Sequence, residues 1–229
     1  MLTISPFSKL KIFISEKKDG SIDSPKQAFE LLQQYQTNLS ICYFHHLHQV
    51  DRHHCLQRPK KKIEEVWADA AITNQKTCLA MKVADCFPIV LTSQTTPVVA
   101  LIHAGWKPLL QNIIKLTLLD LQLRHNLLPG NVKAWIGPGI HSCCYHFKEK
   151  PIQADWYSWQ PAIKKIDNTW RIDLIQFIIH ELSQAGIKKN SIINFDQCTG
   201  CQSDSFFSHF QANQSDSISG RMLVAAKLM

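Results

Sequence analysis

The stretch that most constrains the fold is residues 78–104, where three apolar segments follow one another with only short polar breaks. The segments "CLAMKV", "FPIVLT" and "PVVALIHA" are rich in branched and aromatic side chains. Short apolar runs bounded by turn residues are typical of buried strands. Only a short polar stretch around "SQTTP" separates the last two segments. We therefore predict that these two strands pair as an antiparallel hairpin.

Beyond this hairpin the apolar spacing changes to that of a helix. A helix is predicted from Pro108 to the break at Pro129 and Gly130, because its apolar residues recur every three or four positions. These residues are Leu109, Leu110, Ile113, Ile114, Leu118 and Leu121. Two further helices are predicted, one after the N-cap Ser24 and one from the N-cap Asp173 to Gly186.

Additional strands are predicted at "LKIFIS", "LSICYFHHL", "VKAWIGPGI", "SIINF" and "GRMLVAAKL". The region between the second of these and Lys62 is predicted to be a His-rich, basic loop. Strands alternate with helices, and no repeat or long linker divides the chain. We therefore predict an α/β protein, a single domain over residues 1–229, with mixed β-sheet layers flanked by helices.

Composition excludes several classes of function. The 229 residues carry a formal charge of +7, but the basic residues are scattered, and the one dense run, "RPKKK" at 58–62, is typical of a solvated loop. No nucleic-acid-binding motif is present, so no nucleic-acid partner is expected. No apolar run reaches the roughly 20 residues of a membrane span, and no signal peptide is apparent. We expect a cytosolic protein without a membrane partner, whose eight cysteines are thiols.

The outer ends of the predicted hairpin carry Cys86 and His103. Pairing of the strands brings this thiol and this imidazole to one edge, with Gly105 allowing close backbone approach. The pair is half of a zinc site, half of a Cys–His catalytic pair, or a core cysteine beside a capped histidine. The stretch "HHLHQVDRHHC", His45 to Cys55, is the densest group of further ligands.

Three other motifs have two interpretations each. The "CTGC" of Cys198 and Cys201 is a redox pair or two metal ligands, and the non-helical sequence after it argues against redox chemistry. The "IGPGI" turn containing Gly137 is an anion cradle or a plain turn. Arg221 in "SGRM" is a phosphate contact or a surface arginine.

Taken together and in order, the motifs resemble those of the YfiH-like family, also called the laccase-domain or multicopper polyphenol oxidoreductase family. The matching motifs are "WADAAIT" (67–73), "VADCFPIVL" (83–91), "VALIHAGWK" (99–107), "AWIGPGI" (134–140), "DQCT" (196–199), "FFS" (206–208) and "SGRM" (219–222). The resemblance implies a zinc-dependent purine nucleoside phosphorylase that also deaminates adenosine, with purine nucleosides and phosphate as partners. It also implies a fold related to a toxin deamidase domain.

The resemblance assigns the site residues. It places metal ligands at Cys86 and His103, and its third ligand position, a histidine after Gln-Val in the family, holds Asp51 here. The alternatives for this third position are His48, His53 and His54. Asp85 would orient a ligand or handle a proton beside the catalytic Cys86 and His103. Lys107, Arg221 and Gly137 would contact substrate or phosphate. The resemblance implies zinc as the metal. Copper-dependent phenol oxidation is not expected, because the sequence shows no set of histidines sufficient for a trinuclear copper cluster.

The sequence departs from the family pattern at several positions. Glu16 stands about where an arginine is expected, Pro108 replaces a glycine, and "HFQAN" at 209–213 replaces a Tyr-Arg-Arg-Asp element. A bidentate guanidinium is not replaced by neutral side chains. Two alternatives to the phosphorylase therefore remain: a metal-free cysteine hydrolase using Cys86 and His103, and a catalytically weakened binding protein on the same scaffold.

Overall fold

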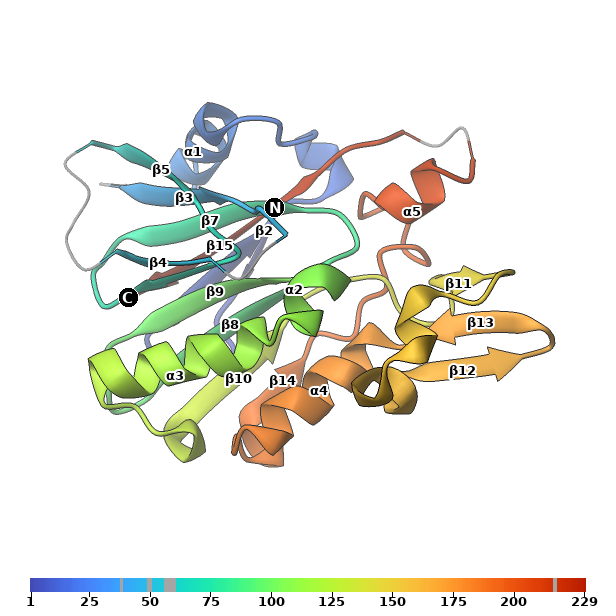
Figure 1. The fold of residues 1–229 in the computed structure, drawn as a ribbon. Helices are drawn as coiled ribbons and strands as arrows, with labels where there is room; N and C mark the ends of the chain where they lie inside the picture. The colour runs from blue at the N-terminus through green and yellow to red at the C-terminus, as the bar shows by residue number, and fades with distance from the viewer. Residues whose placement is uncertain (38, 49–50, 56–60, 216–217) are drawn as a thin grey trace.

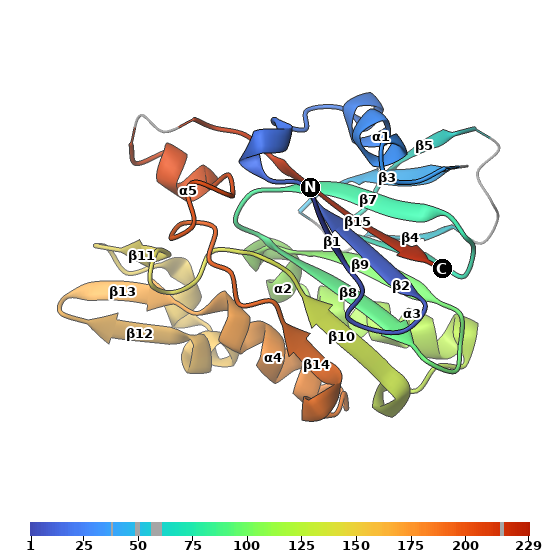
Figure 2. The same ribbon diagram turned by 180° about the vertical axis from the view of Figure 1, so that it is seen from behind.

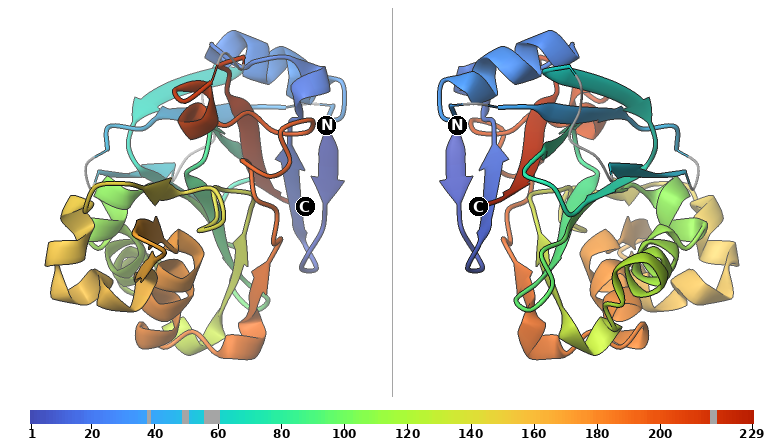
Figure 3. Two further views of the ribbon diagram at one scale, coloured as in Figure 1. Left: turned by 90° about the vertical axis from the view of Figure 1, so that its right-hand side faces the viewer. Right: turned by 90° about the vertical axis from the view of Figure 1, so that its left-hand side faces the viewer.

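Two six-stranded β-sheets pack face to face, and helices cover both outer faces (Figures 1 and 3). The computed structural model describes residues 1–37, 39–48, 51–55, 61–215 and 218–229. The first sheet has the order β1 (Leu2–Ile4), β2 (Leu10–Ile14), β15 (Met222–Leu228), β7 (Cys78–Val83), β3 (Ile41–His45) and β5 (Ile63–Trp67). The second has the order β14 (Ile192–Asn194), β10 (Val132–Ile136), β8 (Phe87–Ser93), β9 (Val99–Ala104), β6 (Ala70–Thr73) and β4 (Arg52–Cys55). The predicted α/β fold with mixed sheets and flanking helices is confirmed.

The strands of the predicted hairpin are mostly apolar because both of their faces are covered. Ile89 and Ile102 pack under the helices α3 (Ile113–His125) and α4 (Leu174–Gln184), which lie on the outer face of the second sheet. Val90 and Leu101 point the other way and pack against the first sheet. Side chains alternate between the faces of a strand, so burial on both sides produces a continuous apolar run.

The outer face of the first sheet is covered by α1 (Pro25–Gln33), which packs Phe29 and Leu32 against it. The predicted N-cap is confirmed, because the Ser24 hydroxyl accepts the Gln27 backbone N–H at 3.2 Å. Seen from behind, the second strand, β2, lies directly beside the C-terminal strand β15 (Figure 2).

The predicted helix after Pro108 is wrong in its boundaries. The segment is two helices, α2 (Trp106–Leu110) and α3, and α2 begins two residues before the proline. Asn112 separates them with a left-handed φ of 62°, which a continuous helix does not permit. The helix starting after Asp173 is confirmed, since this carboxylate caps α4 through Gln176. Among the described residues, no helix has the length and apolar character needed to cross a bilayer.

The region predicted to be a loop up to Lys62 contains a strand, because β4 pairs in parallel with β6. Residues 146–172 add a small third sheet that the sequence pattern did not reveal, in the order β11 (His146–Phe147), β13 (Thr169–Ile172), β12 (Ile163–Ile166). These strands are short and mostly half-exposed, so no apolar pattern marks them. The fifth helix, α5 (His209–Ala212), follows the N-cap Ser208.

Candidate metal centre and adjoining pocket

Cys86 and His103 meet at one end of the β8–β9 hairpin. His103 is the register partner of Pro88, and Cys86 precedes Pro88 by two residues, so both side chains point to the same face. A Cβ atom at Gly105 would lie 2.8 Å from the Cys86 Sγ and 3.5 Å from the His103 Nε2. Gly105 therefore leaves the space in which thiol and imidazole face each other, as the sequence pattern predicted.

Asp69 holds the His103 ring in place. The His103 Nδ1 lies 3.1 Å from the Asp69 Oδ1, and both side chains are essentially excluded from solvent. The His103 backbone N–H also donates to the Asp69 carbonyl at 2.8 Å. A carboxylate on one ring nitrogen leaves the other free for a metal, as is usual for metal-binding histidines. Asp69 lies in the "WADAAIT" motif, which was the one available signal for its role.

The Asp69 and Cys86 charges determine the protonation of His103. Burial by itself lowers the pKa of this imidazole, but the neighbouring Cys86 thiolate and the hydrogen bond to Asp69 outweigh it and raise the pKa to about 9. Without a metal, the arrangement therefore favours a protonated His103.

Two histidines from the segment after β3 complete a compact group. The His46 ring stacks on His103 with centroids 4.1 Å apart, and His48 meets the same ring edge-on at 5.2 Å. The ligand atoms of these three histidines all lie within 4.8 Å of one another. Burial and the charges of His103 and His48 lower the pKa of His46 to about 3. Its Nδ1 is buried without a hydrogen-bond partner among the described residues.

Among the described residues, the side chains of Asp51 and His53 do not group with His103. Asp51 is exposed, and its carbonyl accepts the Asp69 N–H at 2.8 Å. Its carboxylate belongs to none of the ligand groups formed by the described residues. His53 instead groups with Cys42 and Glu64, and the side chain of His54 lies outside the described part of the chain. His48 is the alternative that lies with His103.

A pocket of about 270 Å³ opens beside Cys86. Its walls come from α2, from the segment after β10 and from α5, which are far apart in the sequence. The lining residues are His48, Ala84, Asp85, Cys86, Gly105, Trp106, Lys107, Ile140, Tyr145, Leu174, His209, Phe210 and Asn213. An aromatic wall with a few polar groups is typical of a small-molecule site. The sequence did not single out Tyr145, and it marked the 209–213 segment only by its missing arginines.

Asp85 joins three segments around this pocket. One carboxylate oxygen accepts the Thr199 hydroxyl at 2.6 Å, and the other accepts the Phe210 backbone N–H at 2.7 Å. Its own carbonyl accepts the Ile140 N–H at 2.8 Å. The residue adopts a positive φ of 78°, which aspartate tolerates better than most residues. Both oxygens are thus engaged in holding the walls of the pocket together.

The three predicted phosphate contacts are placed differently. Lys107 is exposed and lines the pocket, with its ammonium 5.5 Å from the centre of the Trp106 ring. Arg221 is not among the lining residues, and its guanidinium donates to the carbonyl of Gly220 at 2.9 Å. Gly137 is buried, and a Cβ there would lie 2.6 Å from the Pro88 ring, so close packing explains this glycine.

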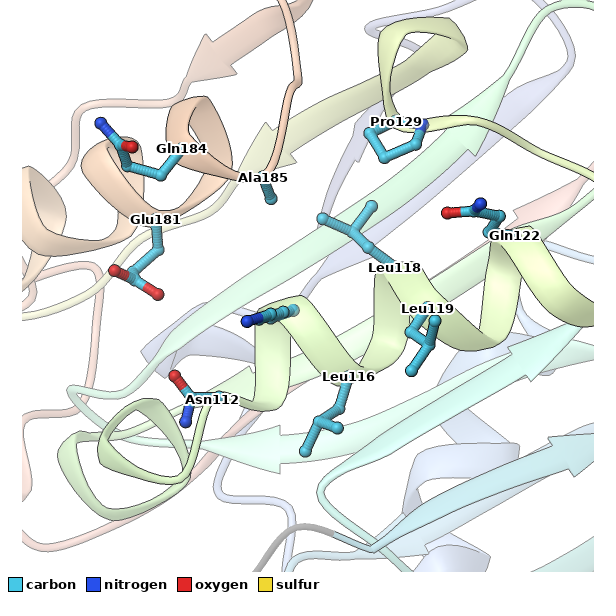
Figure 4. A pocket seen from close by; sticks show the side chains of 10 residues that line it. Asn112, Leu116, Leu118, Leu119, Gln122, Pro129, Glu181, Gln184 and Ala185 are labelled. Carbon is cyan, nitrogen blue, oxygen red and sulfur yellow. The ribbon is translucent and has the colours of Figure 1, made fainter.

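A second hollow of about 450 Å³ lies between α3 and α4 (Figure 4). Leu116, Leu118 and Leu119 line it from α3, and Glu181 and Gln184 line it from α4. None of the described residues that line it is a cysteine or a histidine. This hollow therefore lacks the thiol and imidazole groups that Cys86 and His48 contribute to the pocket beside them.

The structure is thus a layered α/β fold with a Cys–His group at its strand ends and an adjoining pocket of small-molecule size. Residues 16–229 match the family model described as multi-copper polyphenol oxidoreductase laccase, and the chain belongs to this family.

Relatives with curated names are distant. A purine nucleoside phosphorylase of Clostridium acetobutylicum is 26% identical over 155 residues, covering 67% of this chain and 64% of that protein. An adenosine deaminase, RL5, from an unknown prokaryotic organism is 29% identical over 150 residues, covering 61% of this chain and 55% of that protein. The matched region thus spans somewhat more than half of these relatives. In structure, the chain is similar to the YfiH protein of Bacillus licheniformis, with a TM-score of 0.82 at 23% identity over 100% of this chain and 96% of that one.

Proposed function

We propose that the protein is a zinc-dependent purine nucleoside phosphorylase that also deaminates adenosine. The observation that carries the proposal is that His48 lies beside His103 and the Cys86 thiol faces the same imidazole, at a pocket with aromatic walls and a lysine. The names of the distant relatives support the same two reactions.

The residues present fit a zinc ion. One thiolate and two imidazoles are a common donor set for catalytic zinc, which keeps a fourth position open. The buried, unpartnered Nδ1 of half-buried His46 and the Asp69 carboxylate behind His103 fit a metal centre as well. We assign the third ligand to His48 in place of Asp51. When bound, zinc supplies a Lewis acid that activates water or polarises a substrate oxygen.

The other pocket residues bind and orient the substrate in this proposal. Trp106, Tyr145 and Phe210 offer apolar faces against which a purine ring stacks. Lys107 attracts the phosphate dianion and stabilises the negative charge that it carries. Asp85 keeps the pocket walls in register, because its two carboxylate oxygens accept hydrogen bonds from Thr199 and Phe210.

A metal-free cysteine hydrolase is the second candidate. The raised pKa of His103 beside the Cys86 thiol favours it, since an imidazolium–thiolate pair is an activated nucleophile. The two candidates differ in their need for metal and for phosphate.

The test uses the full chain purified without a histidine tag. Metal content is measured by mass spectrometry, and adenosine, inosine and guanosine are incubated with and without phosphate. We expect base release that requires phosphate, and ammonia release from adenosine. We also expect the bound metal to be zinc and not copper, although a Cys–His donor set also binds copper. No product from any nucleoside with zinc bound contradicts the proposal.

Matched variants test the ligand assignment. Cys86→Ala and His48→Ala should each lose about one zinc per chain together with nucleoside turnover, whereas Asp51→Ala should keep both. Zinc loss in Asp51→Ala but not in His48→Ala would favour Asp51, the residue that the resemblance places at the third ligand position. Cys86-dependent hydrolysis in metal-free protein would favour the hydrolase.

A further inference from the structure

We propose that Cys143, Cys144, Cys198 and Cys201 form a second metal site that binds one zinc ion as four thiolates. The sulfur of Cys143 lies 3.8 Å from that of Cys144, 3.5 Å from that of Cys198 and 3.2 Å from that of Cys201. The sulfurs of Cys144 and Cys201 are 3.4 Å apart. This site is independent of the proposed function.

The spacing of the sulfurs suits a tetrahedron around one ion. With Zn–S bonds of about 2.3 Å, the edges of a tetrahedral four-thiolate site are about 3.8 Å long. All four sulfurs lie within 4.8 Å of one another, so small side-chain rotations would close the site. A disulfide instead requires about 2.05 Å between two sulfurs and would leave the other two thiols without a shared role.

The pairing of two neighbouring strands brings the two pairs of cysteines together. Cys143 and Cys144 follow β10, Cys198 and Cys201 follow β14, and these two strands are parallel neighbours. The pairing continues past the strand ends, because the Thr199 N–H donates to the Gly139 carbonyl at 3.0 Å. Both pairs of thiols are thus brought to one point by main-chain hydrogen bonds.

Gly200 lets the two cysteine pairs approach. A Cβ at this position would lie 2.6 Å from the Cys144 Cβ and 2.8 Å from its Sγ, so any other residue would push the "CTGC" turn away. The Cys198 sulfur also accepts the His141 backbone N–H at 3.4 Å. Such N–H···S bonds orient and stabilise metal-bound thiolates.

The charge and exposure of the cluster fit a structural zinc. Four thiolates around zinc carry a net charge of −2, and the Arg171 guanidinium donates to the carbonyls of Ser142 and Cys143, at 3.1 and 3.5 Å. Cys143 and Cys201 are exposed while Cys198 is buried, which provides an entry path for the ion. Four protein ligands leave no open position, so the expected role is structural.

The cluster adjoins the walls of the pocket. Thr199, next to Cys198, donates its hydroxyl to Asp85, and Tyr145, next to Cys144, lines the pocket. A zinc ion bound by the four cysteines would hold the segments that contain Tyr145 and Thr199 in place beside the pocket at Cys86.

The experiment counts zinc in variants of the full, untagged chain. Cys198→Ser and Cys201→Ser should each hold one zinc per chain fewer than the parent, whereas Cys78→Ala, a buried thiol outside the cluster, should hold the parent amount. Cys201→His should retain the ion, because three thiolates and one imidazole also bind structural zinc. Unchanged zinc in both serine variants overturns the proposal.

X-ray absorption at the zinc edge keeps the test decisive if a serine variant does not fold. In Cys86→Ala, which removes the candidate ligand beside His103, the remaining zinc should show only sulfur neighbours at about 2.3 Å. Nitrogen or oxygen neighbours, iron in place of zinc, or a disulfide mass among the four cysteines would overturn the proposal. Loss of zinc from Cys86→Ala but not from Cys201→Ser would leave the phosphorylase proposal standing and refute this one.

Discussion

Replacing Asp85 by asparagine tests whether this carboxylate holds the pocket together. Both of its oxygens accept hydrogen bonds, from the Thr199 hydroxyl at 2.6 Å and from the Phe210 N–H at 2.7 Å, and the side chain is only 8% exposed. Asparagine has the same shape and tolerates the positive φ of 78° equally well. The substitution therefore removes the charge with little change in the backbone.

The expected loss of stability in Asp85→Asn follows from the two hydrogen bonds. Hydrogen bonds to a charged group contribute about 1.5–3 kcal/mol each and neutral ones about half of that. In Asp85→Asn the amide oxygen still accepts the Phe210 N–H, and the rotated Thr199 hydroxyl accepts from the amide, so both bonds become neutral. We expect a loss of about 2 kcal/mol, which lowers the Tm of a chain of this size by roughly 4–8 °C. Asp85→Ala removes both bonds and should cost about 3–6 kcal/mol.

Thermal and urea unfolding of the parent, Asp85→Asn, Thr199→Val and the double variant measure this cost. The double-mutant cycle should show a coupling of about 1 kcal/mol or more, because the two side chains share one bond. An unchanged Tm in Asp85→Asn together with lost nucleoside turnover would refute the reasoning and return Asp85 to the chemical role that the sequence suggested.

Other substitutions have equally definite outcomes. Gly105→Ala places a Cβ 2.8 Å from the Cys86 sulfur and should weaken zinc binding at this centre at least about tenfold in a competition titration; unchanged affinity would show that the sulfur is not confined there. Ile102→Ala, in the fully buried hairpin, should lose about 2–5 kcal/mol in urea unfolding, whereas Leu123→Ala, 73% exposed on α3, should stay within about 0.5 kcal/mol. Asp173→Ala removes the N-cap of α4 and should cost about 1 kcal/mol, with Asp173→Ser restoring most of the loss; equal stability of both variants would contradict a capping role.

The strands and helices that the sequence revealed are those whose burial pattern is local. The β8–β9 hairpin is apolar on both faces because it lies between the helices and the first sheet, and α1 and α4 begin at capping side chains. The strand β4 escaped prediction because its polar "RHHC" sequence forms a strand only by pairing with β6. The break at Asn112 was missed because the apolar spacing continues across it.

The candidate site likewise has one part that the sequence predicted and one part that it did not. The hairpin pattern alone placed Cys86 beside His103, since register follows from the turn. The third ligand remains a proposal: motif alignment counts positions, whereas the path of the chain after β3 brings the His48 ring to His103, and the Asp51 carboxylate joins no ligand group among the described residues. Arg221 satisfied a motif and yet is not among the residues that line the pocket.

The sequence by itself determined the layered α/β fold and the meeting of Cys86 with His103, because periodic burial and short-range pairing are encoded by neighbouring residues. Only the tertiary structure decided that Thr199 contacts Asp85 across 114 positions and that Cys201 reaches Cys143 across 58. These contacts depend on how strands distant in sequence pair and where their loops then point. No local pattern carries that information, because a residue's type does not specify its distant partner.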